Sequence, residues 1–380
     1  MLKFAPYVLK SLWRHRTRTA LTVCGAAIAL VVFTFIGALQ DGLAGLTRGP
    51  ETERTLIVFQ ANRFCPSTSR LPEDYAGIIS KLDGVRDITP VKVFMNNCRA
   101  SLDVIVFNGL PAEKLRTARD LTLIAGDWGE FERHRDAAVV GQAVARRRGL
   151  SVGQRFSVGE VTVTVVGIFT AAEPAEENFL YTHLEFLQRT RGLNSVGTVT
   201  QFEVRLKEGA DAQSICRNID LAFRNGPIVT DTRPKGVFQS RAVGDLAELI
   251  NVARFVGYVC VAMVLALVAT AAVMAVQDRV RETAVLQTLG FSGPLIFRLV
   301  LAESLIVSLA GGLLGVGVAL AALAGSGLTV GTEGVMVTIA PSVQLGITGL
   351  WVTMAVGVLA GFVPGLQASR SSIVASLRNV

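Results

Sequence analysis

The sequence predicts an α-helical membrane protein with four transmembrane helices plus a large α+β extracytoplasmic domain inserted between helices 1 and 2. Three observations lead to this fold class. Hydrophobic residues make up 51% of the chain and charged residues only 18%, which is unusually apolar for a soluble protein. Four windows each offer about 20 apolar residues without a charge, enough to cross a bilayer. Between the first two windows, strand-like and helix-like patterns alternate.

The four charge-free windows are Ala20–Leu39, Phe255–Val276, Leu305–Ala324 and Ile347–Leu366. The predicted transmembrane helices are residues 20–39, 255–276, 294–324 and 347–366. Basic residues precede the first window, as in a signal peptide. Its apolar stretch is longer than a signal core, however, and no cleavage site follows it closely. We therefore interpret it as a retained signal anchor.

Lysine and arginine gather in three segments outside the spans: the amphipathic N-terminal segment 1–19, the loop 277–293 and the tail 367–380. The loop 325–346 contains neither. By the positive-inside rule, the first three segments are cytoplasmic, and the loop 325–346 and the insert 40–254 are extracytoplasmic. The arginines of the insert do not oppose this orientation, because long domains cross the membrane largely regardless of charge.

The insert is long enough to fold around its own core. Runs rich in β-branched and aromatic residues, bounded by turn formers, predict strands. They are Thr55–Phe59, Val91–Met95, Leu102–Gly109, Val161–Phe169 and Thr200–Leu206. Helices are predicted over Asp74–Leu82 and Asp211–Phe223, the second with Ile215, Ile219 and Ala222 on one face. Strands mixed with helices indicate an α+β domain.

No catalytic or metal site stands out. The histidines, His15, His134 and His183, are far apart in the sequence, and no P-loop, serine-hydrolase or zinc-protease motif occurs. The arginines 146–148 precede Gly149, a pattern that predicts a helix end rather than a nucleic-acid contact.

Five cysteines are scattered along the chain, at positions 24, 65, 98, 216 and 260. Cys65 and Cys98 both lie in the insert, where export permits a disulfide. The odd number and the lack of a pairing pattern leave their pairing open, and buried free thiols are the preferred interpretation.

Residues 279–291 predict a short amphipathic helix that turns sharply into the third span. Charges stand at its start, apolar side chains share one face, and Ser292 and Pro294 suit the start of the next helix. Such a helix either docks on a partner protein or rests on lipid headgroups. The residues of interest are Arg279, Arg281, Glu282, Val285, Leu286, Leu289 and Gly290.

Three further features lie in or near the spans. Glu303 places a carboxylate about two turns inside the third span, which is costly at the bilayer centre and cheaper near the cytoplasmic interface. Small residues every four positions let helices approach closely, within one chain or in a dimer; they are Gly311, Gly315, Gly357, Gly361 and Gly365. An apolar stripe leading into the second span predicts a stalk helix; it comprises Val243, Leu246, Ile250 and Ala253.

Several segments carry a resemblance to a known family. RVRETAVLQTLG (279–290), with an acidic residue in the next span, resembles the R-x-x-E-[IT]-[AG]-[IV]-L-[RQ]-[AT]-L-G pattern of FtsX/MacB-like ABC transporter permeases. The ending GLQASRSSIVASLRNV is similar to the family's tail, with Ile373 where a proline is usual. AVVGQAVARRRGLSVGQRF and VTVTVVGIF resemble segments of its outer domain. The chain looks like a membrane subunit without a fused ATPase, of the DevC-like or macrolide/lipoprotein-exporter-like kind.

The resemblance implies a permease in the bacterial inner (plasma) membrane. Residues 279–290 would be the coupling helix, docked on a separate ATPase that is present in two copies and binds the ATP and Mg. Hydrolysis there would move the extracytoplasmic domain by mechanotransmission and export a hydrophobic or amphipathic substrate such as a drug, lipid, lipoprotein or peptide. The permease itself would be no enzyme and would bind no cofactor or nucleic acid. It would form a homodimer or pair with a paralogous permease, and an adaptor and an outer-membrane channel are possible further partners.

Two other functions compete with export. A non-transporting transmembrane signalling subunit that activates an extracytoplasmic cell-wall hydrolase is the alternative, although the insert is large for that branch of the family. Ion-driven secondary transport is disfavoured, because the spans lack paired buried charges and broken helices. Substrate identity and the choice between homodimer and heterodimer cannot be read from the sequence.

Overall fold

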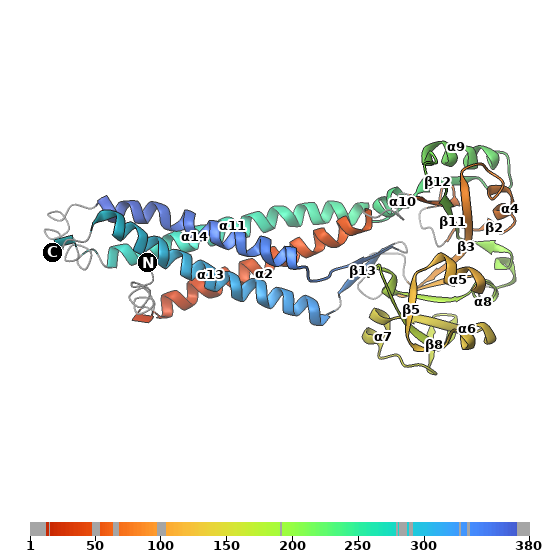
Figure 1. The fold of residues 1–380 in the computed structure, drawn as a ribbon, viewed down its shortest axis with the longest axis horizontal. Helices are drawn as coiled ribbons and strands as arrows, with labels where there is room; N and C mark the ends of the chain where they lie inside the picture. Colours follow the sequence, from red (N-terminus) through yellow and green to blue (C-terminus); the bar gives the residue numbers. More distant parts are fainter. Residues whose placement is uncertain are drawn as a thin grey trace. The chain divides into compact units, whose positions relative to one another are not determined.

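The computed structural model describes residues 13–14, 16–47, 54–63, 68–96, 104–190, 192–278, 280, 287–288, 292–326, 328–332 and 335–370. The chain divides into two compact units (Figure 1). The first takes its residues from Met1–Gln40, Leu249–Ser326 and Ala340–Val380, and the second from Asp41–Glu248 and Gly327–Ile339. The second unit is therefore the insert together with a short segment from much later in the sequence.

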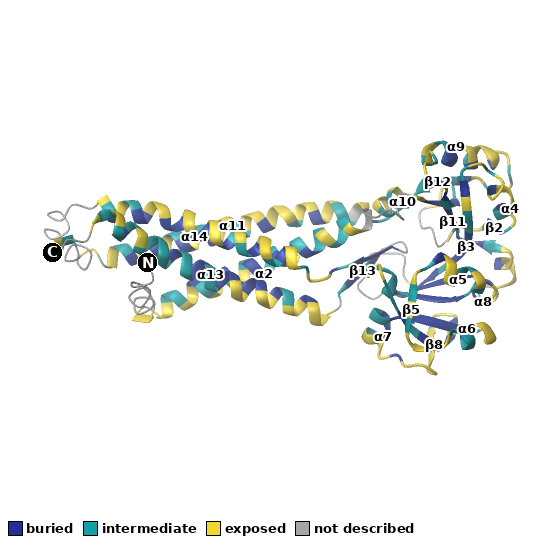
Figure 2. Cartoon of the chain, viewed as in Figure 1, coloured by how far each residue is buried: buried dark blue, intermediate teal, exposed yellow. Residues whose placement is uncertain are grey.

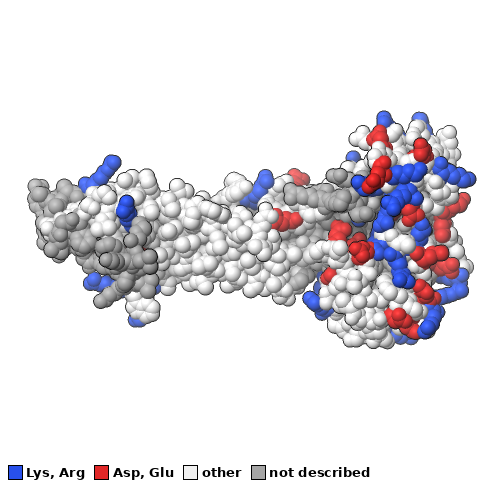
Figure 3. All heavy atoms as spheres, in the orientation of Figure 1, with Lys and Arg blue, Asp and Glu red and all other residues white. Residues whose placement is uncertain are grey.

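Long apolar helices build the first unit. They are α2 (Arg16–Thr47), α11 (Gly244–Asp278), α13 (Gly293–Ser326) and α14 (Val343–Arg370). All four are long and apolar enough to cross a membrane. Figure 2 shows exposed residues along them, and these include large apolar side chains such as Phe255, Met263 and Trp351. Few charged side chains appear on the visible face of these helices, whereas many cover the second unit (Figure 3). This outward-facing apolar surface suits a lipid environment.

A ten-stranded sheet organises the second unit. Its strands are β1 (Thr55–Gln60), β3 (Val85–Met95), β4 (Val106–Leu110), β5 (Leu121–Gly126), β6 (Ala137–Gly141), β7 (Arg155–Val158), β8 (Val161–Ala171), β9 (Phe179–His183), β11 (Gln201–Leu206) and β12 (Thr230–Pro234). The order is β12-β1-β11-β3-β4-β9-β6-β8-β5, with β7 beside β8. Neighbours are antiparallel except β4 with β9 and β6 with β8.

Two small pairings complete the strands: β2 (Leu71–Pro72) with β10 (Thr198–Val199), and β13 (Thr329–Thr332) with β14 (Val335–Thr338). Short helices connect and cover the sheet. They are α4 (Tyr75–Ile79), α5 (Ala112–Ala118), α6 (Trp128–Arg133), α7 (Gln142–Arg148), α8 (Leu184–Thr190), α9 (Ala212–Ala222) and α10 (Lys235–Ala242), with 3-10 turns η3 (Glu176–Asn178) and η4 (Leu193–Ser195).

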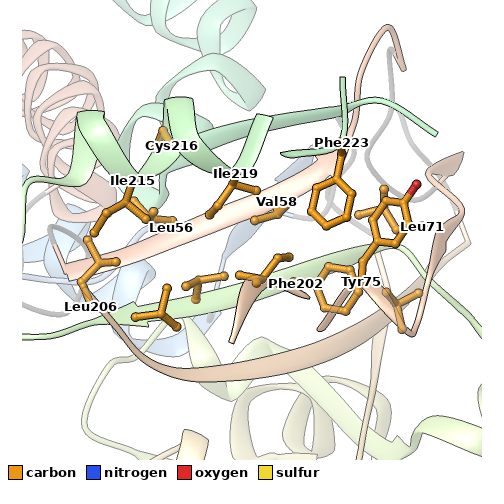
Figure 4. Close-up of a cluster of buried hydrophobic side chains, with 14 of the residues drawn as sticks. Leu56, Val58, Leu71, Tyr75, Phe202, Leu206, Ile215, Cys216, Ile219 and Phe223 are labelled. Atoms are coloured by element: carbon orange, nitrogen blue, oxygen red, sulfur yellow. The ribbon is translucent and has the colours of Figure 1, made fainter. Parts of the chain in front are cut away.

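One face of the sheet around β1 and β11 is sealed by α9 and α4. Ile215, Ile219 and Phe223 point from the α9 segment toward the strands, where Phe202 lies among the buried side chains (Figure 4). The Tyr75 ring of α4 stacks on Phe223 with their centroids 3.9 Å apart. Side chains alternate along a strand, so the residues between these buried ones point to the opposite face.

The five predicted strands overlap β1, β3, β4, β8 and β11. The sequence interpretation missed β2, β5, β6, β7, β9, β10 and β12. It also treated residues 325–346 as a loop, although they contain the β13–β14 hairpin. The predicted face of α9 was wrong at Ala222, which is exposed because the helix ends there and Phe223 takes the buried place. The predicted end of α7 is confirmed: Gly149 adopts φ 64°, ψ 36°, a left-handed conformation that glycine adopts readily.

Candidate functional site

A cavity lies on the sheet face opposite α9. Ile57 of β1 and Glu203 of β11 line it, as alternation along their strands requires. Its empty volume, including the open mouth, is about 740 Å³. The remaining lining residues come from β3, β4, β9, β11, the position after α5, η3 with the segment before it, α10 and the hairpin. They are Val93, Met95, Asn108, Arg119, Glu173, Ala175, Glu176, Phe179, Tyr181, Gln201, Lys235, Phe238, Gln239, Val335 and Met336.

A buried ionic network forms one wall of this cavity. Arg119, which follows α5, donates from Nη2 to Glu203 Oε1 at 2.7 Å and from Nε to the Tyr181 hydroxyl at 3.3 Å. The Tyr181 hydroxyl in turn donates to Glu176 Oε2. The side chains of Arg119, Glu203 and Glu176 are only 10–14% exposed. Buried charges are tolerated when paired and hydrogen-bonded in this way, and removing one partner leaves the other uncompensated.

The network fixes the protonation of its members. Burial alone would raise the pKa of Glu203, but the charge and the hydrogen bond of Arg119 outweigh burial and lower it from 4.5 to about 2. Burial would lower the pKa of Arg119, and the carboxylates of Glu203 and Glu176 raise it instead. Burial and the charge of Glu176 raise the pKa of the Tyr181 hydroxyl. At neutral pH this wall therefore presents the Arg119 cation, the Glu203 carboxylate and the neutral Tyr181 phenol.

The β13–β14 hairpin closes another side of the cavity. Met336 is 2% exposed and packs with Met95, Val104 and Val106. Arg147 Nη1 at the end of α7 donates to Thr329 Oγ1 at 2.6 Å. Two further contacts hold the hairpin: Asn178 Nδ2 donates to Thr338 Oγ1 at 3.1 Å, and Val335 and Val337 pack with Val243. A segment that separates α13 from α14 in the sequence is thus part of the core of the inserted domain.

Two groups of residues singled out in the sequence lie outside the described residues. They are the coupling-helix set, Arg279, Arg281, Glu282, Val285, Leu286, Leu289 and Gly290, and the cysteines Cys65 and Cys98. The docking role of the first group and the pairing of the second stay predictions. Among the residues that the structure does describe, no cluster of side chains is suited to hold a metal ion.

The five predicted packing glycines all lie where another helix of the same chain passes closely. A Cβ added at Gly315 of α13 would lie 2.5 Å from the Ala27 carbonyl oxygen and 2.9 Å from Leu30 Cβ, both in α2. Gly311 also faces α2, whereas Gly357, Gly361 and Gly365 of α14 face α13. Packing within one chain therefore accounts for these glycines, and a role in a dimer stays a prediction.

The predicted stalk stripe is split between two helices. Val243 ends α10 with φ −103° and ψ 12°, and α11 begins at Gly244, so its inclusion in one continuous helix was wrong. Val243 and Ile250 are nonetheless buried, and Leu246 and Ala253 are half-buried. The stripe faces the interior, while its role in transmitting motion stays a prediction.

Glu303 lies in a cleft of the helical unit with an empty volume of about 340 Å³. Arg18 lines the same cleft and donates from Nη1 to Asp278 Oδ2 at 2.7 Å. The other lining residues are Thr19, Thr22, Val268, Ala271, Ala272, Ala275, Ser304 and Val307. A cation and hydroxyl groups near the carboxylate reduce the cost of placing it within a span.

Two family models match consecutive parts of the chain. The model described as MacB-like periplasmic core domain matches residues 19–220, which is more than half of the chain. The chain belongs to the FtsX/MacB-like ABC permease family. The model described as FtsX-like permease C-terminal matches residues 254–373, which include most of α11 and all of α13 and α14. This FtsX/MacB-like permease is accordingly a membrane subunit of the ABC-transporter type, with an extracytoplasmic domain between its first and second membrane helices.

Solved structures of parts of transporters and permeases are similar to the chain. The periplasmic region of MacB from Actinobacillus actinomycetemcomitans matches with a TM-score of 0.37 and 11% identity, covering 53% of this chain and 96% of that one. The extracellular domain of the noncanonic ABC-type transporter YknZ from Gram-positive bacteria matches with a TM-score of 0.35 and 15% identity, covering 47% of this chain and 98% of that one. A domain of a putative permease protein from Porphyromonas gingivalis matches with a TM-score of 0.33 and 16% identity, covering 49% of this chain and 93% of that one. Comparison with curated proteins found no significant match.

Proposed function

We propose that this permease is the membrane subunit of an ABC exporter whose ATPase is a separate subunit. Two ATPase copies hydrolyse ATP at the cytoplasmic face of a permease dimer. The movement of the long helices reaches the extracytoplasmic domain and drives export of a hydrophobic or amphipathic substrate. The match of residues 254–373 to the FtsX-like permease C-terminal model supports the role of a membrane subunit.

The hairpin between α13 and α14 is the observation that carries the proposal. Its Met336 is buried among Met95, Val104 and Val106 of the inserted domain. Pulling a packed side chain such as this one out of a core costs several kcal/mol, so the hairpin and the domain move together. The cavity beside the hairpin favours transport over signalling alone, because a signalling domain needs a protein-binding surface and not an internal site.

Leu286→Asp tests the coupling. We place Leu286 on the apolar face of the coupling helix, and a carboxylate buried there without a partner costs several kcal/mol at an ATPase interface. The variant should insert normally but should fail to co-purify with its ATPase or to stimulate ATP hydrolysis. Thr288→Asp, at an exposed position two residues away, is the matched control and should recruit the ATPase normally.

Normal recruitment and transport by Leu286→Asp would show that the docking surface lies elsewhere. Loss of membrane association without loss of ATPase binding would instead show that the helix rests on lipid.

A further inference from the structure

The cavity of the inserted domain carries a net negative charge. Of the side chains that line it, Glu173, Glu176 and Glu203 are carboxylates, and Arg119 and Lys235 are cations, which leaves −1 at neutral pH. The chain as a whole carries +7. The cation of Arg119 is already engaged by Glu203 and Tyr181. An incoming ligand therefore meets an excess of acceptors.

Several of these acceptors have capacity to spare. Gln239 Oε1 is fully buried and accepts no hydrogen bond from any described residue. Glu203 Oε1 accepts from Arg119 and Gln201, and no bond to its second oxygen occurs within the described part of the chain. Asn108 is 8% exposed and also lines the cavity. A buried acceptor without a partner, such as Gln239 Oε1, favours a ligand that donates hydrogen bonds.

The rest of the cavity is apolar and adaptable. Its apolar wall consists of Ile57, Val93, Met95, Phe179, Phe238, Val335 and Met336. Two of these residues are methionines, whose flexible side chains accommodate apolar groups of varied shape. The empty volume of about 740 Å³ includes open solvent at the mouth, so a ligand can enter the cavity from outside.

We propose that this cavity binds the protonated amine of a small amphipathic molecule, with the ammonium group against Glu203 and Gln239 and the apolar part against Met95, Phe238 and Met336. The proposal rests on the proposed transport function and deepens it by naming the substrate class. The residues that line the cavity belong to segments next to the long helices in the sequence. Gln239 belongs to α10, which directly precedes α11, and Met336 belongs to the hairpin between α13 and α14. A ligand there contacts segments that continue into three of the four long helices.

The six methionines of the chain allow a direct test. Met95 and Met336 line the cavity and report binding there. Met263, Met274 and Met354 lie in α11 and α14 and report partition of the added probe into the membrane. The full-length protein in lipid nanodiscs, labelled at the methionine methyl groups, would be titrated with n-octylammonium and with n-octyl sulfate while methyl NMR shifts are recorded. The two probes share a chain and differ in the sign of the head group.

We expect saturable shifts of the Met95 and Met336 methyl signals with octylammonium, at a half-saturating concentration about ten-fold lower than with octyl sulfate, because one charge-assisted hydrogen bond is worth about a factor of ten or more. Gln239→Leu should weaken octylammonium binding by a similar factor. Gln213→Leu, at an exposed position on α9, is the matched control and should have no effect. Lys235→Gln removes the remaining cation and should tighten octylammonium binding.

Equal affinity for the two probes, or tighter binding of octyl sulfate, would overturn the proposal. So would shifts at Met95 and Met336 that only follow those at Met263, Met274 and Met354. ATPase recruitment is measured separately, so the two proposals fail independently. Recruitment without amine binding refutes the cavity proposal alone, and amine binding without recruitment refutes the coupling.

Discussion

Arg119→Met should destabilise the inserted domain by leaving the Glu203 carboxylate buried without its partner. The pKa of Glu203 falls from 4.5 to about 2 in the folded protein. At about 1.4 kcal/mol per pKa unit, this difference corresponds to about 3 kcal/mol in the free energy of unfolding at neutral pH. Breaking a buried ion pair from one side costs a similar amount, about 3 to 5 kcal/mol. Adding Glu203→Gln to Arg119→Met should restore most of that loss.

The pH dependence has a definite sign. Folding lowers the pKa of Glu203, so its carboxylate adds to the free energy of unfolding. This contribution is fully present above pH 4.5 and is lost as the pH falls from 4.5 toward 2. The free energy of unfolding of Glu203→Gln should not show this loss at low pH.

The exposed ion pair between Arg133 and Glu130 is the matched control for Arg119→Met, because its side chains are 71% and 43% exposed. Arg133→Met should lower the free energy of unfolding by about 0.5 kcal/mol or less.

Urea unfolding followed by Trp128 fluorescence would measure these energies. Trp128 lies in the inserted domain, and replacing Trp13 and Trp351 by phenylalanine makes it the sole reporter. A double-mutant cycle then gives the coupling between Arg119 and Glu203. If the two substitutions are additive to within about 0.5 kcal/mol, the buried pair does not stabilise the domain as argued.

Two more predictions follow from packing and burial. Gly315→Val should destabilise the helical unit by about 1 to 3 kcal/mol through overpacking against α2. Gly317→Val should destabilise it much less, because a Cβ at that position meets nothing within 4 Å. Equal melting temperatures of the two variants, measured by helical circular dichroism, would contradict this prediction. Burial and the charge of Asp220 raise the pKa of the Cys216 thiol from 9.0 to about 12, so at pH 8 iodoacetamide should alkylate it at least about 100-fold more slowly in the folded than in the urea-unfolded protein. Folding stabilises the neutral thiol, so this contribution is lost as the pH rises above 9 toward 12, and equal alkylation rates would refute the assignment.

The helices and the strongest strands could be predicted because their signal is local. Uncharged apolar windows and runs such as VTVTVVGIF predict a helix or a strand from consecutive residues alone. The ionic network could not be predicted in this way, because Arg119 and Glu203 are 84 positions apart in the sequence. Periodicity tells which face of a strand a residue occupies, but not which residue of another element it will meet.

The hairpin was missed for a different reason. Residues 325–346 contain no lysine or arginine, and this absence indicates the orientation in the membrane but not the secondary structure. The valines of TVGTEGVMVT alternate with other residues on both sides of Glu333 and Gly334, a pattern typical of two short strands around a turn. The packing of the hairpin against the inserted domain depends on tertiary contacts that no local pattern encodes.

The hairpin also constrains how the protein can be made. Chains emerge from the ribosome N-terminus first, so residues 54–248 of the inserted domain are complete while Met336 is still unsynthesised. The apolar surface of Met95, Val104 and Val106, which Met336 covers in the finished protein, stays open until α11 and α13 have been made. Exposed apolar surface invites misassembly during that interval. The extracytoplasmic domain therefore cannot reach its final state ahead of the membrane region, and biogenesis of the two must finish together.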